Sequence, residues 1–117
     1  KILFEDPELG FCICAHHYEG KRVSNPHDHG PSWAIYGQAR GETIMTDYAL
    51  IEPAGEGKRG KVRTVRSYSL TPGIAHLYNE GDLHAPRRDA TTKLIRIEGR
   101  NLDKVRRFGY DLVQSTP

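Results

Sequence analysis

From residue 11 to residue 99 the chain reads as short runs of β-prone residues, several of which alternate apolar and polar side chains with a period of two. Gly, Pro, Asn and Asp residues interrupt these runs. The predicted strands span residues 11–19, 32–38, 42–51, 61–70, 74–78 and 92–98. The predicted breaks fall at Gly20, 25–26, Gly41, 53–60, 72–73 and 87–90. Many short strands joined by tight turns predict an all-β sandwich or barrel.

The tail at residues 100–117 contains the one helical pattern in the chain. Asn101 suits a helix N-cap. Leu102, Val105 and Phe108 would then share one helix face, and Gly109 would end the helix. We expect this short helix or tail to cover a sheet face or an open barrel end.

The loop at residues 55–60 matches the glycine-rich pattern G-x-G-x-x-G of dinucleotide-binding turns. Such a turn must be followed by a helix, because the helix N-terminus receives the pyrophosphate. Here the β-patterned residues 61–65 follow instead. The loop is therefore predicted to be a flexible hairpin connection.

Length and charge narrow the class of protein. The 117 residues suit one domain, residues 1–117, with a core at about 11–99. The 17 Lys and Arg residues nearly balance the 15 Asp and Glu residues, which argues against a nucleic-acid partner. No apolar run approaches the roughly 18 residues of a membrane span, so no membrane partner is expected.

Cys12 and Cys14, the only cysteines, lie two residues apart in an apolar stretch. On a strand their side chains would be parallel, which disfavours a disulfide and favours a reduced, cytoplasmic protein. No leader is visible, and the sequence leaves open whether one was removed before Lys1. Cys12, Cys14 and His16 would share one strand face, so buried thiols or a second metal site are the two interpretations.

The six histidines are the unusual feature of the composition. His27 and His29 flank Asp28, and in an extended segment residues two apart project from the same face. Two imidazoles placed in this way can converge on one metal ion, whereas Asp28 would point away and stabilise the loop. His76 and His84 are the two candidates for a third ligand, because each follows a Gly-x-x-His turn.

The order of these motifs resembles the cupin superfamily, whose first motif carries His-x-His and whose second carries Gly-x-x-His. The segments 27–37 and 78–84 are further similar to the thiol dioxygenases, the cysteine and 3-mercaptopropionate dioxygenases. The resemblance implies a cupin double-stranded β-helix, a small jelly-roll barrel. The general cupin motif has a glutamate ligand shortly after His-x-His, where this chain has Trp33 and Ala34. A three-histidine site is therefore implied.

This implied site takes its metal ligands from His27, His29 and His84, with His76 as the reserve ligand. The cofactor would be one divalent metal ion. Fe(II) is favoured by the resemblance, and imidazole ligands also suit Ni, Zn, Mn, Cu or Co. Three neutral imidazoles leave coordination positions open for a substrate.

The chain departs from the thiol dioxygenases in the last barrel strand. There Leu94, Arg96 and Glu98 replace a serine, a histidine and a tyrosine that reach towards the metal. If Arg96 and Glu98 face inwards, they are candidate catalytic residues, and Arg96 could bind a substrate carboxylate. The alternative is an outward polar face over a core of Ile95 and Ile97.

Trp33, Tyr36 and Arg88 are further candidates for binding a substrate. Arg87 is a candidate for the same reason as Arg88, because an arginine side chain can recognise an anionic group. Surface ion pairs are the alternative role for the two arginines, and core packing is the alternative for the two aromatic residues.

We expect a metal-dependent, oxygenase-like enzyme that acts on a small polar or anionic substrate, with dioxygen as a candidate co-substrate, and that is not a standard cysteine dioxygenase. The alternative is a non-catalytic cupin that binds or senses a small molecule. A homodimer is expected because exposed edge strands invite pairing.

Overall fold

Ten β-strands form the regular structure of the described residues, 1–101 and 108–113, in this computed structural model. In chain order the strands are β1 (Ile2–Glu5), β2 (Cys12–Tyr18), β3 (Arg22–Val23), β4 (Ala34–Arg40), β5 (Thr43–Glu52), β6 (Gly60–Leu70), β7 (Ala75–Tyr78), β8 (Leu83–Arg88), β9 (Thr92–Glu98) and β10 (Tyr110–Leu112). The all-β prediction is confirmed.

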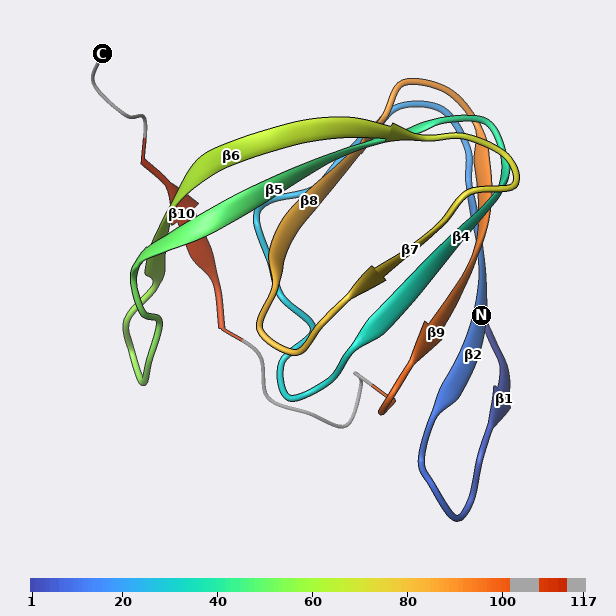
Figure 1. The fold of residues 1–117 in the computed structure, drawn as a ribbon, viewed down its shortest axis with the longest axis horizontal. Coiled ribbons are helices and arrows are strands. Elements are labelled where there is room, and N and C mark those ends of the chain that lie inside the picture. The colour runs from blue at the N-terminus through green and yellow to red at the C-terminus, as the bar shows by residue number, and fades with distance from the viewer. Residues whose placement is uncertain (102–107, 114–117) are drawn as a thin grey trace.

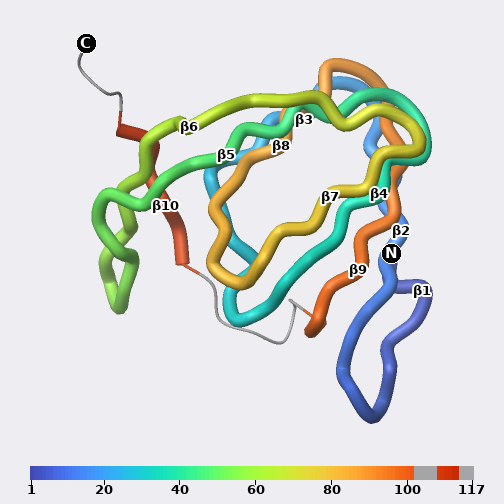
Figure 2. The backbone as a smooth tube through the Cα atoms, viewed as in Figure 1, coloured from blue at the N-terminus to red at the C-terminus, as the bar shows by residue number. Residues whose placement is uncertain are grey.

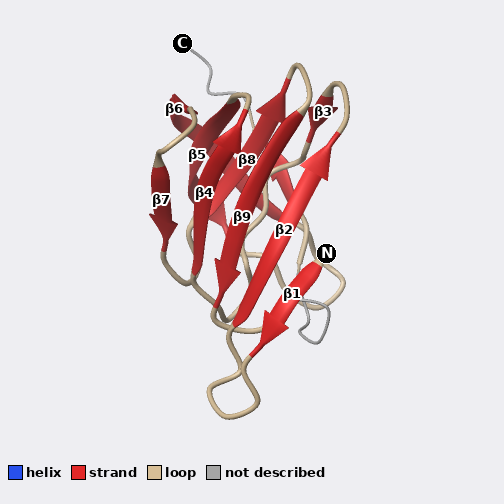
Figure 3. Ribbon diagram, turned by 90° about the vertical axis from the view of Figure 1, so that its right-hand side faces the viewer, coloured by secondary structure: helices blue, strands red, loops and turns tan. Residues whose placement is uncertain are grey.

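The strands form two five-stranded sheets that curl around a common interior (Figure 1). One sheet has the order β1-β2-β9-β4-β7 and the other has the order β10-β6-β5-β8-β3. Strands adjacent in a sheet are mostly distant along the chain, as when β9 lies between β2 and β4 (Figure 3). This crossing pattern is that of a jelly roll.

Two turns show how local chemistry directs the chain. Between β4 and β5, Gly41 has a φ of +74°, and a Cβ there would lie 2.5 Å from the carbonyl oxygen of Thr91. Only glycine meets both conditions, because it lacks the Cβ. The connection from β5 to β6 is a hairpin, closed by mutual backbone hydrogen bonds between Gly55 and Lys58. The predicted hairpin loop is confirmed.

The larger core cluster lies between the sheets. Its buried members come from both sheets and are Ala34, Tyr36, Met45, Leu70 and Tyr78. A second cluster, Val62, Leu83 and Tyr110, joins β10 to β6 and β8. Each large apolar side chain buried in this way contributes about 1.5–3 kcal/mol to the free energy of folding.

Several elements differ from the predicted pattern. β1, β3, β8 and β10 are additional strands, and Figure 2 shows how the backbone reaches them. The predicted break at 87–90 is wrong at its start, because β8 continues through Pro86 to Arg88. The proline is accommodated where the pairing with β3 ends, and its carbonyl accepts a hydrogen bond from Ser24. The helix predicted from Asn101 lies largely outside the described residues.

Candidate metal centre

His27 is placed by the backbone. It forms an isolated bridge with His84, in which each backbone N–H donates to the other's carbonyl oxygen at 2.9 Å. Because residues directly opposite in an antiparallel bridge project to the same side, the two imidazoles meet, with ring centroids 4.8 Å apart. The loop before β4 is thereby attached to β8.

His29 joins this pair. Its ring centroid lies 4.8 Å from that of His84 and 5.7 Å from that of His27. One nitrogen from each of the three rings lies within 4.8 Å of the others, and His29 and His84 are buried. Metal–imidazole bonds are about 2.1 Å long, so small rotations of the rings would bring all three nitrogens to one ion. The donor set therefore fits a divalent metal ion.

Hydrogen bonds orient the loop that carries the pair. The Nδ1 of His27 lies 2.9 Å from the carbonyl oxygen of Asn25, so we assign the proton to Nδ1 and the lone pair to Nε2. Asp28 accepts hydrogen bonds from the backbone N–H of Gly30 at 2.9 Å and from the hydroxyl of Tyr110 at 3.2 Å. Asp28 thus stabilises the loop and ties it to β10.

Two tyrosines pack against the histidines. The hydroxyl of Tyr36 lies 2.9 Å from Nε2 of His29 and 3.5 Å from Nε2 of His84. Burial raises the pKa of Tyr36 above its usual value, so the hydroxyl keeps its proton and remains a hydrogen-bond donor. The ring of Tyr78 packs on His84 at a centroid distance of 4.2 Å.

The orientation of β9 is settled by the structure. Leu94, Arg96 and Glu98 face the interior, and Ile95 and Ile97 face outwards. The alternative of a core formed by the two isoleucines is therefore wrong. The inward face can be polar because Arg96 lines a cavity and is ion-paired with the carboxylate of buried Glu98.

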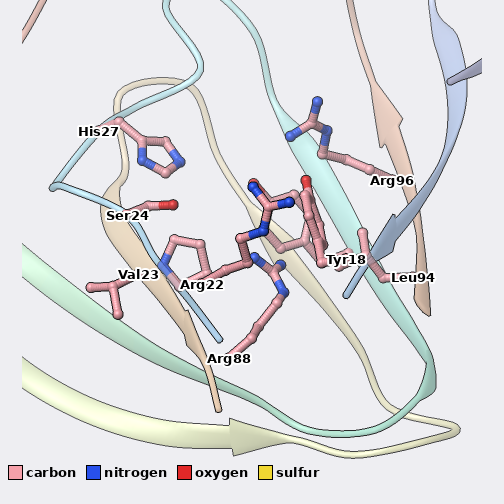
Figure 4. Close-up of a pocket in the computed structure, with 10 residues that line it drawn as sticks. Tyr18, Arg22, Val23, Ser24, His27, Arg88, Leu94 and Arg96 are labelled. Atoms are coloured by element: carbon pink, nitrogen blue, oxygen red, sulfur yellow. The ribbon is translucent and has the colours of Figure 1, made fainter. Parts of the chain in front are cut away.

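A cavity of about 210 Å³ lies beside the histidines, inside the barrel (Figure 4). It is lined by Tyr18, Arg22, Val23, Ser24, His27, Tyr36, Pro86, Arg88, Leu94 and Arg96. Figure 4 shows the imidazole of His27 at one side and the side chains of Arg22, Arg88 and Arg96 around the same space. The three arginines give this cavity a positive electrostatic potential.

Among the candidates for binding a substrate, Tyr36, Arg88 and Arg96 line this cavity. Trp33 does not line it and is 39% exposed. Arg87 points to the opposite side of β8 and pairs with Asp89 at the surface, at 3.4 Å.

The remaining candidates lie away from the three histidines. His76 stacks on Tyr68 and packs against the ring of Tyr78, which lies between it and His84, so His76 does not belong to the cluster. Cys12 and Cys14 are buried thiols on one face of β2. Among the described residues, the cysteines and His16 belong to no cluster that could hold a metal ion.

Tyr18 and Arg22 are among the cavity residues that were not predicted. Tyr18 ends β2, and Arg22 lies on the two-residue strand β3. The only sequence signal was the charge of Arg22. Its position opposite Arg88 becomes visible only in the strand register.

No helix among the described residues is long and apolar enough to cross a membrane.

Comparison with known proteins identifies the fold of this chain but no family to which it belongs. No protein-family model matches the chain, and no curated protein matches it. Among solved structures, KdgF from Halomonas sp. is 19% identical with a TM-score of 0.64, and the match covers 90% of this chain and 81% of that one. A cupin superfamily protein from Desulfitobacterium hafniense is 11% identical with a TM-score of 0.62, covering 86% and 75%.

A structure of oxalate oxidase is 16% identical with a TM-score of 0.52, and the match covers 77% of this chain and 41% of that one. At such identities the likeness shows the fold alone. The fold is the cupin jelly-roll barrel, as the sequence motifs predicted.

Proposed function

We propose that this protein is a metal-dependent cupin enzyme that holds one divalent ion through His27, His29 and His84 and acts on a small anionic substrate. The observation that carries the proposal is the convergence of three imidazole nitrogens within 4.8 Å, beside a cavity lined by arginines. Three imidazole ligands leave open coordination positions, which is typical of catalytic metal sites.

When bound, the ion would supply Lewis-acid or redox chemistry, and Fe(II) is favoured by the resemblance to thiol dioxygenases. The side chain of Arg96 lines the cavity and would hold an anionic group of the substrate. Buried Glu98 is ion-paired with Arg96, so we assign it the role of a positioning residue. The hydroxyl of Tyr36 would donate a hydrogen bond at the centre.

The finer proposal is an oxygenase-like oxidoreductase that is not a standard cysteine dioxygenase. It rests on the two histidine motifs of the sequence and on the different residues of β9. Leu94, Arg96 and Glu98 present an arginine–carboxylate pair where a histidine and a tyrosine hydroxyl would stand. Losing a hydrogen-bond donor aimed at developing charge typically costs about 100-fold or more in rate.

Elemental analysis of protein purified without added metal tests the centre. We expect about one divalent ion per chain, lost in His27→Ala and in His84→Ala and kept in the control His76→Ala. His84 is fully buried, so loss of metal in His84→Ala alone would not separate a ligand role from a folding defect. His27 lies in a loop, and His27→Ala therefore serves as the second test. Less than a tenth of an ion per chain, even after loading with Fe(II), Ni(II) or Zn(II), would contradict the proposal.

Oxygen consumption by iron-loaded protein tests the finer proposal. We expect turnover of cysteine and of 3-mercaptopropionate at least 100-fold below about 1 per second, a usual enzymatic rate. Turnover of either thiol near that rate would contradict the claim that β9 redirects the chemistry. A bound ion without turnover of any candidate from a broad screen of small anions would favour the sensor alternative instead.

A further inference from the structure

Arg88 is a buried cation that forms no ion pair with any carboxylate of the described residues. Its side chain projects inwards from β8, and the residue is 5% exposed. The ion pairs among the described residues do not include Arg88. Burial, and to a smaller extent the positive charge of Arg96, lowers the pKa of Arg88, and the nearby Tyr18 and Tyr36 partly offset this shift. Because a buried charge without a counter-charge is costly, this position calls for an anion.

The guanidinium of Arg88 is held in place by a short chain of hydrogen bonds. Its Nε donates to Oγ1 of Thr43 at 3.2 Å, and that hydroxyl donates to Oε1 of Gln38 at 3.0 Å. The amide nitrogen of Gln38 donates to the carbonyl oxygens of Arg40 and Gly41. This chain uses Nε and leaves the two terminal amino groups directed at the cavity that Arg88 lines.

Arg22 adds a second positive charge at the same place. It lies directly opposite Arg88 in the antiparallel pairing of β3 with β8, and both residues line the cavity. Their guanidinium carbons lie 5.8 Å and 4.5 Å from the ring centroid of Tyr18 (Figure 4). Like charges directly opposite on paired strands are unfavourable, and an anion between them would remove the repulsion.

We propose that Arg88, Arg22 and Tyr18 form an oxyanion cradle that binds a carboxylate or phosphate group of the substrate at a distance from the reacting group. The inference rests on the proposed function, because it names the substrate class of the same site. It limits the substrate to small molecules that carry an anionic group at the end remote from the metal centre.

Two dimensions of the site define this class further. Arg88 follows His84 by four residues on one strand, so their Cα atoms lie about 13 Å apart. The cavity of about 210 Å³ is smaller than the roughly 300–1,000 Å³ of typical ligand pockets. A small dicarboxylate or a phosphorylated acid fits these limits, whereas a nucleotide or a lipid is too large.

The surroundings of His16 provide an independent reporter for the cradle. Burial, together with the positive charges of Arg96, the N-terminal amine of Lys1 and Arg88, lowers the pKa of His16 to about 4. The hydroxyl of Tyr18 lies 3.2 Å from Nδ1 of His16. An anion bound between the arginines would offset their charge and raise this pKa, which NMR titration of the imidazole measures.

The experiment uses the full chain freed of metal by a chelator, with three probes: succinate, inorganic phosphate and the neutral amide succinamide. Binding is measured by calorimetry and by the rise in melting temperature. We expect succinate or phosphate to bind and succinamide not to bind. Preference for one of the two anions distinguishes a carboxylate substrate from a phosphorylated one.

Variants on β8 and β3 identify which arginines bind the anion. Arg88→Gln should weaken anion binding at least 10-fold, and the exposed Arg22→Gln should weaken it about 3-fold or more. The matched control Arg87→Gln, one residue away on the opposite face, should bind as the wild type does. Because Arg88 is an uncompensated buried cation, Arg88→Gln should match or exceed the melting temperature of the wild type without anion.

Equal binding by Arg88→Gln and wild type, binding of succinamide as tight as succinate, or an unchanged pKa of His16 would overturn the cradle. Anion binding by metal-free protein does not depend on the three histidines. Failure of the metal centre therefore leaves this result intact, and failure of the cradle leaves the metal analysis intact.

Discussion

At the scale of single residues, the histidines differ in function because their surroundings differ. His27, His29 and His84 converge and are suited to share a metal ion. His76 is stacked between tyrosines, away from that cluster. His16 is partly buried near the positive charges of the barrel interior, and burial first and these charges second lower its pKa and keep its imidazole neutral.

His16 makes stability depend on pH. Its folded pKa of about 4 lies below the unfolded value of 6.5, so the unfolded chain binds more protons between these values. The contribution is present above pH 6.5 and is lost as the pH falls towards 4. Urea unfolding at pH 7.5 and pH 5.0 should show a loss about 1 kcal/mol larger for wild type than for His16→Gln, after allowing for solvent screening.

The matched control is His17→Gln, an exposed neighbour on the other face of β2, measured under the same conditions with a chelator present. We expect it to lose as much stability as the wild type. Equal losses for wild type and His16→Gln would show that the pKa of His16 is not lowered in the folded protein.

At the scale of elements, the strands determine which side chains face the interior. β9 pairs with β2 on one side and β4 on the other, so its inward residues are placed by two neighbours. β8 carries His84, Pro86 and Arg88 on its inward face, and thus connects the metal centre to the oxyanion cradle. Because side chains alternate between the two faces of a strand, these three residues lie in one row on the inward face of β8.

The turn between β4 and β5 gives a prediction at this scale. Gly41→Ala combines a positive φ of 74° with a Cβ only 2.5 Å from the carbonyl oxygen of Thr91. We expect a loss of about 2–4 kcal/mol in the free energy of unfolding, measured with urea.

Gly57→Ala is the comparison for Gly41→Ala. Gly57 also has a positive φ, of 66°, but its Cβ would meet open space. This variant should lose only about 1 kcal/mol, the cost of the backbone conformation alone. A similar loss for both variants would mean that the contact with Thr91 is relieved without cost.

At the scale of the whole molecule, the two sheets bring together residues that are more than 50 positions apart. The loop with His27 meets β8 only because the barrel is closed. Metal binding and folding should therefore be coupled. The expected homodimer and the cytoplasmic location stay predictions at this scale.

A metal that binds only the folded chain should stabilise the whole barrel. At a free ion concentration 100-fold above the dissociation constant, the gain is about 2.7 kcal/mol. For a domain of this size we expect a rise of about 10 °C in the melting temperature, measured by calorimetry with and without Ni(II). His27→Ala should show no rise, and an equal rise in that variant would mean that the ion binds elsewhere.

The buried thiols report on opening of the barrel. Cys12 is fully buried and Cys14 is 5% exposed, so a thiol reagent should reach them only when β2 opens. We expect two thiols per chain after denaturation without reductant, and reaction slower by at least 100-fold in the folded protein. Finding no thiol after denaturation would demonstrate a disulfide and an oxidising compartment.

The sequence by itself determined what depends on neighbours along the chain. Period-two alternation predicted most of the strands, and glycine-containing turns predicted the hairpin at residues 55–60. The spacing of His27 and His29 predicted their shared orientation, because residues two apart on an extended chain face the same side. The sequence left open the choice between His76 and His84 and the orientation of β9.

Only the tertiary structure decided those questions, because each depends on pairing between distant strands. The bridge between His27 and His84 selects His84 for the cluster. The two neighbours of β9 turn Arg96 inwards, and the register of β3 on β8 sets Arg22 opposite Arg88. A shift of one residue in any of these registers would move the side chains to the other face. The paired strands are not consecutive along the chain, so no hairpin turn between them sets the register.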